Sequence, residues 1–171
     1  MELQGTGFTL RGWNMDDIFS LQKHADNPNV AKFLMNAFPH PYTIDDAVNW
    51  ITAMQKQNPV LAFGIDVRGR IVGGIDLTIR HDIYSRTSLI GYWLGEQFWG
   101  RGIMTEAVKL MTNYAFAHFD IIRLQAGILS NNPASMRVLE KAGFVCEGVL
   151  RKGIIKDGVV LDEWVYGLVK G

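Results

Sequence analysis

The chain has 171 residues, of which 48% are hydrophobic, so it is long enough to form one domain with a substantial core. Seventeen basic and seventeen acidic residues cancel, and no basic run stands out, so charge gives no indication of nucleic acid or an anionic membrane as a partner. One cysteine excludes an internal disulfide and a cysteine-based zinc cluster, and the four histidines lack the spacing of metal ligands.

The first residues do not combine a basic start with an apolar run, and no apolar stretch approaches the length that crosses a membrane. No repeat, linker or low-complexity segment interrupts the chain. We therefore expect a cytoplasmic protein with a single domain over residues 1–171, whose core lies between about residues 8 and 169.

The N-terminal third predicts a short strand followed by helices. The strand is expected at Phe8–Trp13, where Phe8 and Leu10 share a face. Asn14 is suited to cap the first helix, which Asn27-Pro28 ends or breaks. Thr43 is the next expected N-cap, and the apolar residues after it follow helical spacing.

The middle and the C-terminal part alternate between strands and helices. Arg68-Gly69-Arg70 predicts a hairpin turn, and Asn132-Pro133 predicts a helix start with proline at the first helical position. We expect the remaining strands at Leu61–Val67, Ile71–Ile79, Thr87–Leu94, Ile122–Leu129, Phe144–Arg151 and Val159–Val169, and a long helix at Ile103–Ala117. This order predicts an α+β fold with a mixed sheet.

The segment from Gln97 to Gly102 joins an expected strand directly to an expected helix. Glycines at such a junction expose backbone N–H groups, and the first helical turn adds unpaired donors and a positive dipole end. This geometry suits a phosphate or a pyrophosphate. A dinucleotide fingerprint would need glycine where Thr105 stands, and no Gly-Lys-Ser/Thr phosphate loop is present. A tight turn without any ligand remains an alternative explanation.

A second motif, NNPASMRVLEKAGF at residues 131–144, follows this turn. Together the two segments resemble the GCN5-related N-acetyltransferase (GNAT) superfamily. Gln97, Gly100 and Gly102 match its acyl-CoA signature, and the Asn-x-x-Ser and Glu-Lys-x-Gly-Phe portions of the second motif match in order and separation. The likeness extends from the first strand to Asp162–Tyr166 and is strongest to the ribosomal-protein N-terminal acetyltransferases (RimJ/RimL-like).

The resemblance implies a GNAT fold: a mixed, mostly antiparallel seven-stranded sheet flanked by helices, with two splayed central parallel strands. It also implies that acetyl-CoA is the co-substrate and that no metal is needed. The strand backbone would pair with the pantetheine arm, turn amides would hold the pyrophosphate, and the second motif would reach the pantetheine. The expected cofactor-binding residues are Tyr92, Trp93, Leu94, Gln97, Phe98, Trp99, Gly100, Arg101, Gly102, Ile103, Met104, Thr105, Asn132 and Ser135.

The catalytic groups are less completely matched. The tyrosine that many members use to protonate the thiolate is replaced by Leu139, so Ser135 is the expected acid, as the subgroup implies. The subgroup's loop glutamate aligns with Ile154, so that base is missing; Glu147 is the expected base by its position, with Glu96 and Asp162 as weaker candidates. Ser135 and Asn132 also suit helix capping, and a strand-end glutamate is often simply solvated.

The expected function is transfer of acetyl from acetyl-CoA to a primary amine by direct attack in a ternary complex, and the leading acceptor is a protein N-terminal amine of ribosomal-protein type. A small-molecule amine (polyamine, amino acid or antibiotic) and a non-catalytic acetyl-CoA-binding module are the alternatives. The expected partners are acetyl-CoA and an amine acceptor, without nucleic acid or membrane. Monomer and homodimer both remain open.

Overall fold

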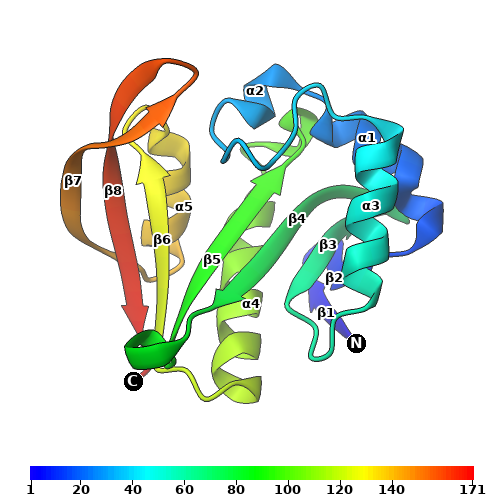
Figure 1. Ribbon diagram of the computed structural model, residues 1–171. Coiled ribbons are helices and arrows are strands. Elements are labelled where there is room, and N and C mark those ends of the chain that lie inside the picture. Colours follow the sequence, from blue (N-terminus) through cyan, green and yellow to red (C-terminus); the bar gives the residue numbers. More distant parts are fainter. The chain divides into compact units, whose positions relative to one another are not determined.

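The computed structural model describes all residues from Met1 to Gly171, and its eight strands are hydrogen-bonded in the order β1-β2-β3-β4-β5-β6-β8-β7 (Figure 1). Helices flank this mixed sheet, so the predicted α+β class is confirmed. The predicted number of seven strands is wrong, because Glu2–Gly5 forms an additional strand, β1, paired with β2 (Phe8–Arg11). The short ELQG segment lacks the apolar alternation that would have indicated a strand.

The chain forms two compact units. Unit 1 comprises Met1–Asp76 and Tyr92–Ala107, and unit 2 comprises Leu77–Gly91 and Val108–Gly171. Three elements supply residues to both units: β4 (Arg70–Ile79), β5 (Thr87–Leu94) and α4 (Ile103–His118).

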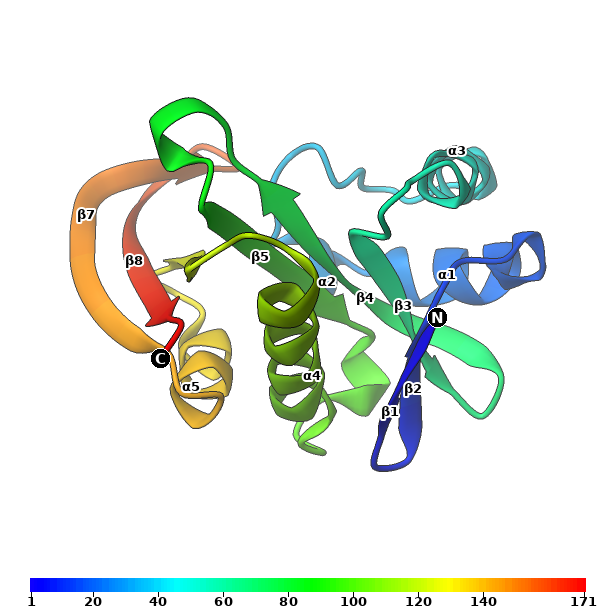
Figure 2. The ribbon, with the colours of Figure 1, turned by 90° about the horizontal axis from the view of Figure 1, so that it is seen from below.

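Unit 1 holds an antiparallel sheet covered on one face by helices. β1, β2, β3 (Ala62–Val67) and β4 pair in sequence, and Figure 2 shows α1 (Ile18–Ala25) and α3 (Ile44–Gln55) over one face of this sheet. The short α2 (Pro28–Ala31) lies between these two helices in the sequence. The core beneath them consists of Trp13, Leu21, Ala25, Tyr42, Ala47, Ile51 and Ile71.

The predicted helix starts of unit 1 are confirmed. Asn14 caps a 3-10 turn that leads into α1, and Thr43 caps α3; each forms a capping box with the acidic residue three positions on. The β3–β4 turn is also confirmed, since Arg68 and Gly69 have φ of 54° and 78°.

Unit 2 contains β6 (Arg123–Leu129), α5 (Pro133–Lys141), β7 (Val145–Lys156) and β8 (Val159–Val169). β8 lies between β6 and β7, and both ladders are antiparallel. Leu139 of α5 and Tyr166 of β8 are almost completely buried, and α5 lies against one face of these strands (Figure 1). β7 continues to Lys156, five residues beyond the predicted end, with two irregularities in its pairing.

β5 and β6 are the parallel pair. Their ladder within unit 2 covers only Thr87–Leu89 against Arg123–Gln125, although β6 continues to pair with β8 as far as Leu129. Within unit 2, the parallel ladder thus ends two residues before this unit's share of β5 ends at Gly91.

Candidate functional site

The turn between β5 and α4 has the conformation that its glycines allow. A 3-10 turn at Glu96–Phe98 follows β5, and α4 begins at Ile103. Gly100 and Gly102 have φ of 72° and 78°, a left-handed region that favours glycine. A Cβ atom at either position would meet nothing within 4 Å. The glycines therefore serve the backbone conformation, and open space lies beside them.

This turn presents a row of unused hydrogen-bond donors. No backbone N–H from Gly100 to Thr105 donates a hydrogen bond within the structure, and the first bond into the helix runs from Glu106 N–H to the Gly102 carbonyl at 3.2 Å. The donors at the start of the sixteen-residue α4 coincide with the positive end of its dipole. Such an arrangement binds phosphate groups.

Side chains of the turn hold its backbone in place. The indole Nε1 of Trp99 donates to the Leu94 carbonyl at 2.7 Å, and Arg101 Nη2 donates to the Gln97 carbonyl at 2.7 Å. The Arg101 guanidinium also lies 5.2 Å from the centre of the Phe98 ring. These contacts occupy side chains and carbonyls, and they leave the N–H groups of the turn available.

Glu96 ties the turn to the N-terminal helices of unit 1. Its carboxylate accepts hydrogen bonds from the side chains of Asn27, at 2.8 Å, and Asn29, at 3.0 Å. These bonds lower the pKa of Glu96. The residue therefore stabilises the entry to the turn and is a poor candidate for taking up protons near neutral pH.

The last residues of β5 pack closely on β4 within unit 1. A Cβ at Gly73 would lie 2.5 Å from the Trp93 carbonyl oxygen, and a Cβ at Gly74 would lie 2.9 Å from the Trp93 Nε1. The two adjacent glycines therefore permit the close approach of Trp93. Its ring contacts Phe38 at 5.5 Å between centroids, and Phe38 in turn contacts Tyr42 at 5.2 Å.

The second motif lies in unit 2, at the start of α5. Asn132 is the N-cap, and its Oδ1 accepts a hydrogen bond from the Ser135 backbone N–H at 3.3 Å. The amide nitrogen of Asn132 donates no hydrogen bond in the structure. Ser135 is buried, with 9% of its surface exposed. Capping thus uses the oxygen of the Asn132 side-chain amide and leaves its nitrogen without a partner.

Glu147 lies on β7 and forms a bidentate ion pair with Arg123 of β6. The two bonds measure 2.7 and 2.9 Å, and they lower the pKa of Glu147. A carboxylate whose two oxygens are held by a guanidinium is a weak proton acceptor. Leu139 and Ile154 stand where the family's tyrosine and glutamate were expected, and Leu139 is completely buried in the core.

Asp76 is a carboxylate of unit 1 that the sequence did not single out. It is one of the last residues of the unit's share of β4, and burial raises its pKa to about 6. The structure shows no hydrogen bond or ion pair to its side chain. The available indication in the sequence was a lone carboxylate within the apolar strand Ile71–Ile79.

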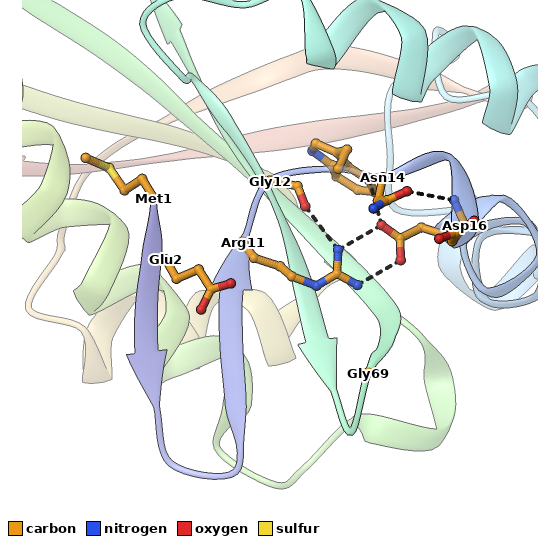
Figure 3. Close-up of a pocket in the computed structure, with 9 residues that line it drawn as sticks. Met1, Glu2, Arg11, Gly12, Asn14, Asp16 and Gly69 are labelled. Atoms are coloured by element: carbon orange, nitrogen blue, oxygen red, sulfur yellow. Dashed lines mark hydrogen bonds and ion pairs between the residues drawn. The ribbon is translucent and has the colours of Figure 1, made fainter.

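A hollow of about 530 Å³ lies elsewhere in unit 1, beside the β1–β2 hairpin and the β3–β4 turn (Figure 3). Its central side chain is Arg11, which bonds bidentately to Asp17 at 2.8 Å and to Asp66 at 2.6 Å. Asp17 also accepts the Asn14 backbone N–H. The charges of Arg11, Asp17 and Asp66 are thus paired with one another, and the cluster has a structural role.

Two further properties bear on the chemistry. No group of three or more His, Cys, Asp or Glu side chains is arranged to hold a metal ion. No helix combines the length and the apolar character needed to span a membrane.

Comparisons with known proteins agree with this geometry. The family model described as "Acetyltransferase (GNAT) domain" matches residues 8–145. "Probable N-acetyltransferase YjcK" of Bacillus subtilis is 38% identical over 135 residues, which cover 75% of this chain and 74% of YjcK. "Putative ribosomal N-acetyltransferase YdaF" of the same organism is 34% identical over 107 residues, or 63% of this chain and 58% of YdaF.

Among solved structures, the microcin C7 self-immunity acetyltransferase MccE in complex with acetyl-CoA and AMP superimposes with a TM-score of 0.82. It is 28% identical, and the alignment covers 96% of this chain and 93% of the MccE chain. The chain therefore belongs to the GNAT acetyltransferase family. It is an N-acetyltransferase with acetyl-CoA as its co-substrate, similar to the ribosomal-protein (RimJ/RimL-like) subgroup.

Proposed function

We propose that this protein acetylates a protein N-terminal amine of ribosomal-protein type. The observation that carries the proposal is the row of unpartnered N–H groups at Gly100–Thr105, which lies within the region that matches the GNAT family. The similarity to a putative ribosomal N-acetyltransferase supports the choice of acceptor. We further propose that residues 1–171 act as one N-acetyltransferase domain, since the family match at residues 8–145 includes residues of both units. We also propose that the protein acts in the cytoplasm.

The cofactor would be held by groups of two kinds. Backbone amides of the turn would bind the pyrophosphate, which the donor row at Gly100–Thr105 and the helix dipole support. Asn132 would donate its free amide nitrogen to a carbonyl of the pantetheine arm, and the backbone at the end of β5 would pair with that arm as an added strand. The residues so assigned are Tyr92, Trp93, Leu94, Gln97, Phe98, Trp99, Gly100, Arg101, Gly102, Ile103, Met104, Thr105, Asn132 and Ser135.

The reaction would be a direct displacement. The acceptor nitrogen forms a bond to the thioester carbonyl carbon, the carbon–sulfur bond breaks, and sulfur leaves with the electron pair. A backbone N–H of β5 would stabilise the oxyanion of the tetrahedral intermediate. The Ser135 hydroxyl would supply a hydrogen bond or a proton to the departing thiolate. Its burial beside the capped start of α5 supports this role, because a fixed donor needs little reorganisation.

The sequence made Glu147 a candidate base, but its ion pair with Arg123 favours a structural role. We propose that it orders the strands of unit 2 through its ion pair with Arg123, because that pair lowers the pKa of the carboxylate. An N-terminal amine has a pKa of about 8, so its proton needs an acceptor that is not already committed to a guanidinium.

A small-molecule amine is the second candidate acceptor. The 28% identity to MccE favours it, because that protein is a microcin C7 self-immunity acetyltransferase whose structure was solved with acetyl-CoA and AMP. A module that binds acetyl-CoA without turnover is the third reading.

A thiol-release assay separates the three proposals. The purified chain is incubated with acetyl-CoA and, in parallel, with peptides bearing free N-termini, the same peptides blocked at the N-terminus, and a panel of small amines. Thiol release with free but not blocked peptides supports the leading proposal. Release only with small amines supports the second candidate, and calorimetric binding of acetyl-CoA without release on any amine supports the third.

A further inference from the structure

The proposed reaction needs a group that takes the proton of the acceptor amine, and the inference below rests on that proposed function. Neither Glu96 nor Glu147 suits the task, since both carboxylates are engaged by hydrogen bonds that lower their pKa. A proton acceptor in an acetyl-transfer site should be uncommitted, shielded from water and open to the substrate on one side.

The register of unit 1 places Asp76 on a defined face of the sheet. Ala62 of β3 is its cross-strand partner, and Gly64 is the partner of Gly74 two positions earlier. Because side chains alternate along a strand, Asp76 shares the face of Gly74. A Cβ at Gly74 would meet the indoles of Trp93, at 2.9 Å, and Trp13, at 3.4 Å. Asp76 therefore lies on the aromatic face of β4.

Two small residues lie next to Asp76 on this face. Ala62 stands across from it on β3, and Gly74 precedes it on the same side of β4. No hydrogen bond or ion pair holds the carboxylate, and burial alone accounts for its raised pKa of about 6. A carboxylate that is largely shielded from water and has no partner costs stability, and such a group is a candidate for a functional role.

The neighbouring groups add aromatic surface and no compensating charge. Trp13 is 7% exposed, and its indole Nε1 is fully buried without a hydrogen-bond partner. Trp93 packs on Phe38 beside the same core. Among the titratable groups of this part of unit 1, burial lowers the pKa of His24 of α1 and raises the pKa of Tyr42 to about 12. Neither contributes to the shift at Asp76.

We propose that the acceptor amine is deprotonated by Asp76 on this aromatic face of unit 1. As the nitrogen–carbon bond forms and the carbon–sulfur bond breaks, the proton lost by nitrogen passes to the Asp76 carboxylate and then to solvent. The aromatic enclosure favours an amine that presents its nitrogen in the uncharged form. The unpartnered Trp13 N–H would favour an acceptor with an oxygen close to that nitrogen, as in the first residue of a peptide.

The test uses Asp76→Asn, which keeps the size of the side chain and removes its basicity. Asp120→Asn is the matched control, because that side chain is 87% exposed. We expect Asp76→Asn to lower kcat for a peptide acceptor by about 10²- to 10⁴-fold, the usual contribution of a general base. The dissociation constant of acetyl-CoA, measured by calorimetry, should stay within about twofold, as should every parameter of the control.

The pH profile supplies a readout that a purely structural role would not change. In the unmodified protein, kcat should fall on the acidic side with an apparent pKa near that of Asp76, and this limb should be absent in Asp76→Asn. Formate should restore part of the activity of Asp76→Ala, because it can occupy the vacated space beside Ala62. A kcat within about threefold of the unmodified protein in Asp76→Asn would overturn the assignment.

Failure of this inference can be told from failure of the proposed function. If the unmodified chain acetylates peptide N-termini and Asp76→Asn does so equally well, the role of Asp76 is disproved and the proposed function stands. If the unmodified chain binds acetyl-CoA and acetylates no amine, both the proposed function and the role of Asp76 are disproved. Near-ultraviolet circular dichroism of each variant shows that a loss of activity is not a loss of fold.

Discussion

The side-chain oxygen of Asn132 accepts the backbone N–H of Ser135 at 3.3 Å, so the residue expected to hold the cofactor also caps α5. Asn132→Asp separates the two roles, since aspartate caps a helix as well as asparagine but carries no amide donor. We expect Asn132→Asp to keep the melting temperature and to weaken acetyl-CoA binding by about tenfold, the usual effect of losing one buried hydrogen bond.

Asn132→Ala is the companion variant. It should weaken acetyl-CoA binding similarly and also lower the free energy of unfolding by about 1 kcal/mol, because the cap is lost. Thermal unfolding and calorimetry measure the two effects. Unchanged acetyl-CoA affinity in Asn132→Asp would reduce Asn132 to a capping residue.

Replacing Ser135 by alanine tests the proposed thiolate donor. The backbone N–H that bonds to Asn132 stays in place, so the cap of α5 should persist. We expect kcat to fall by about 10- to 100-fold with little change in acetyl-CoA affinity, because the hydroxyl acts on charge that develops in the transition state. Steady-state kinetics measure kcat, and calorimetry measures the dissociation constant of acetyl-CoA. An unchanged kcat would show that Ser135 takes no part in the mechanism.

Gly102 and Gly158 form a matched pair for testing the anion site. Both have φ of 78°, and a Cβ at either would meet nothing within 4 Å. Valine at either position should therefore strain the backbone by a similar amount, about 1–2 kcal/mol. Only Gly102→Val should also weaken acetyl-CoA binding, by tenfold or more, since its side chain would fill the space beside the N–H row. Equal acetyl-CoA affinity in the two variants would count against the placement of the pyrophosphate.

Asp76 should make stability depend on pH. Its pKa is about 6 in the folded chain, against about 4 when unfolded, so ionisation disfavours the folded state. The contribution is favourable below pH 4 and is lost as pH rises to about 6; the loss amounts to roughly 2–3 kcal/mol. Asp76→Asn should therefore match the unmodified chain at pH 4 and exceed its stability above pH 6. Chemical denaturation across this pH range measures the free energy of unfolding of both proteins. A difference in stability that does not change with pH would contradict the prediction.

Removing the charge of Glu147 tests its assignment as an ordering residue. Its side chain is 41% exposed, so the ion pair with Arg123 contributes at most about 1 kcal/mol. Glu147→Gln should shift the melting temperature by a few degrees at most, as a change of this size does in a domain of this length. We expect kcat to stay within about threefold. A hundredfold loss of kcat at unchanged acetyl-CoA affinity would instead identify Glu147 as the base.

Much of the fold could be predicted because local rules decide it. Asn14 and Thr43 start helices, and Arg68-Gly69 turns a hairpin, through bonds that involve neighbouring residues only. β1 was not predicted, because Glu2–Gly5 becomes a strand by pairing with β2 and its own residues lack the apolar alternation typical of strands. The extension of β7 to Lys156 likewise depends on pairing with β8 across two irregularities.

The sequence by itself determined the family and the cofactor turn, because glycine spacing and helix-start chemistry act over a few residues and leave a readable motif from Gln97 to Gly102. Only the tertiary structure decided which carboxylates are free to react. Glu147 forms an ion pair with Arg123 across the sheet, whereas Asp76 is half-buried beside Ala62 and Gly74 and has no hydrogen-bond or ion-pair partner. Burial and pairing arise between residues far apart in the chain, so no local pattern reveals how a carboxylate titrates.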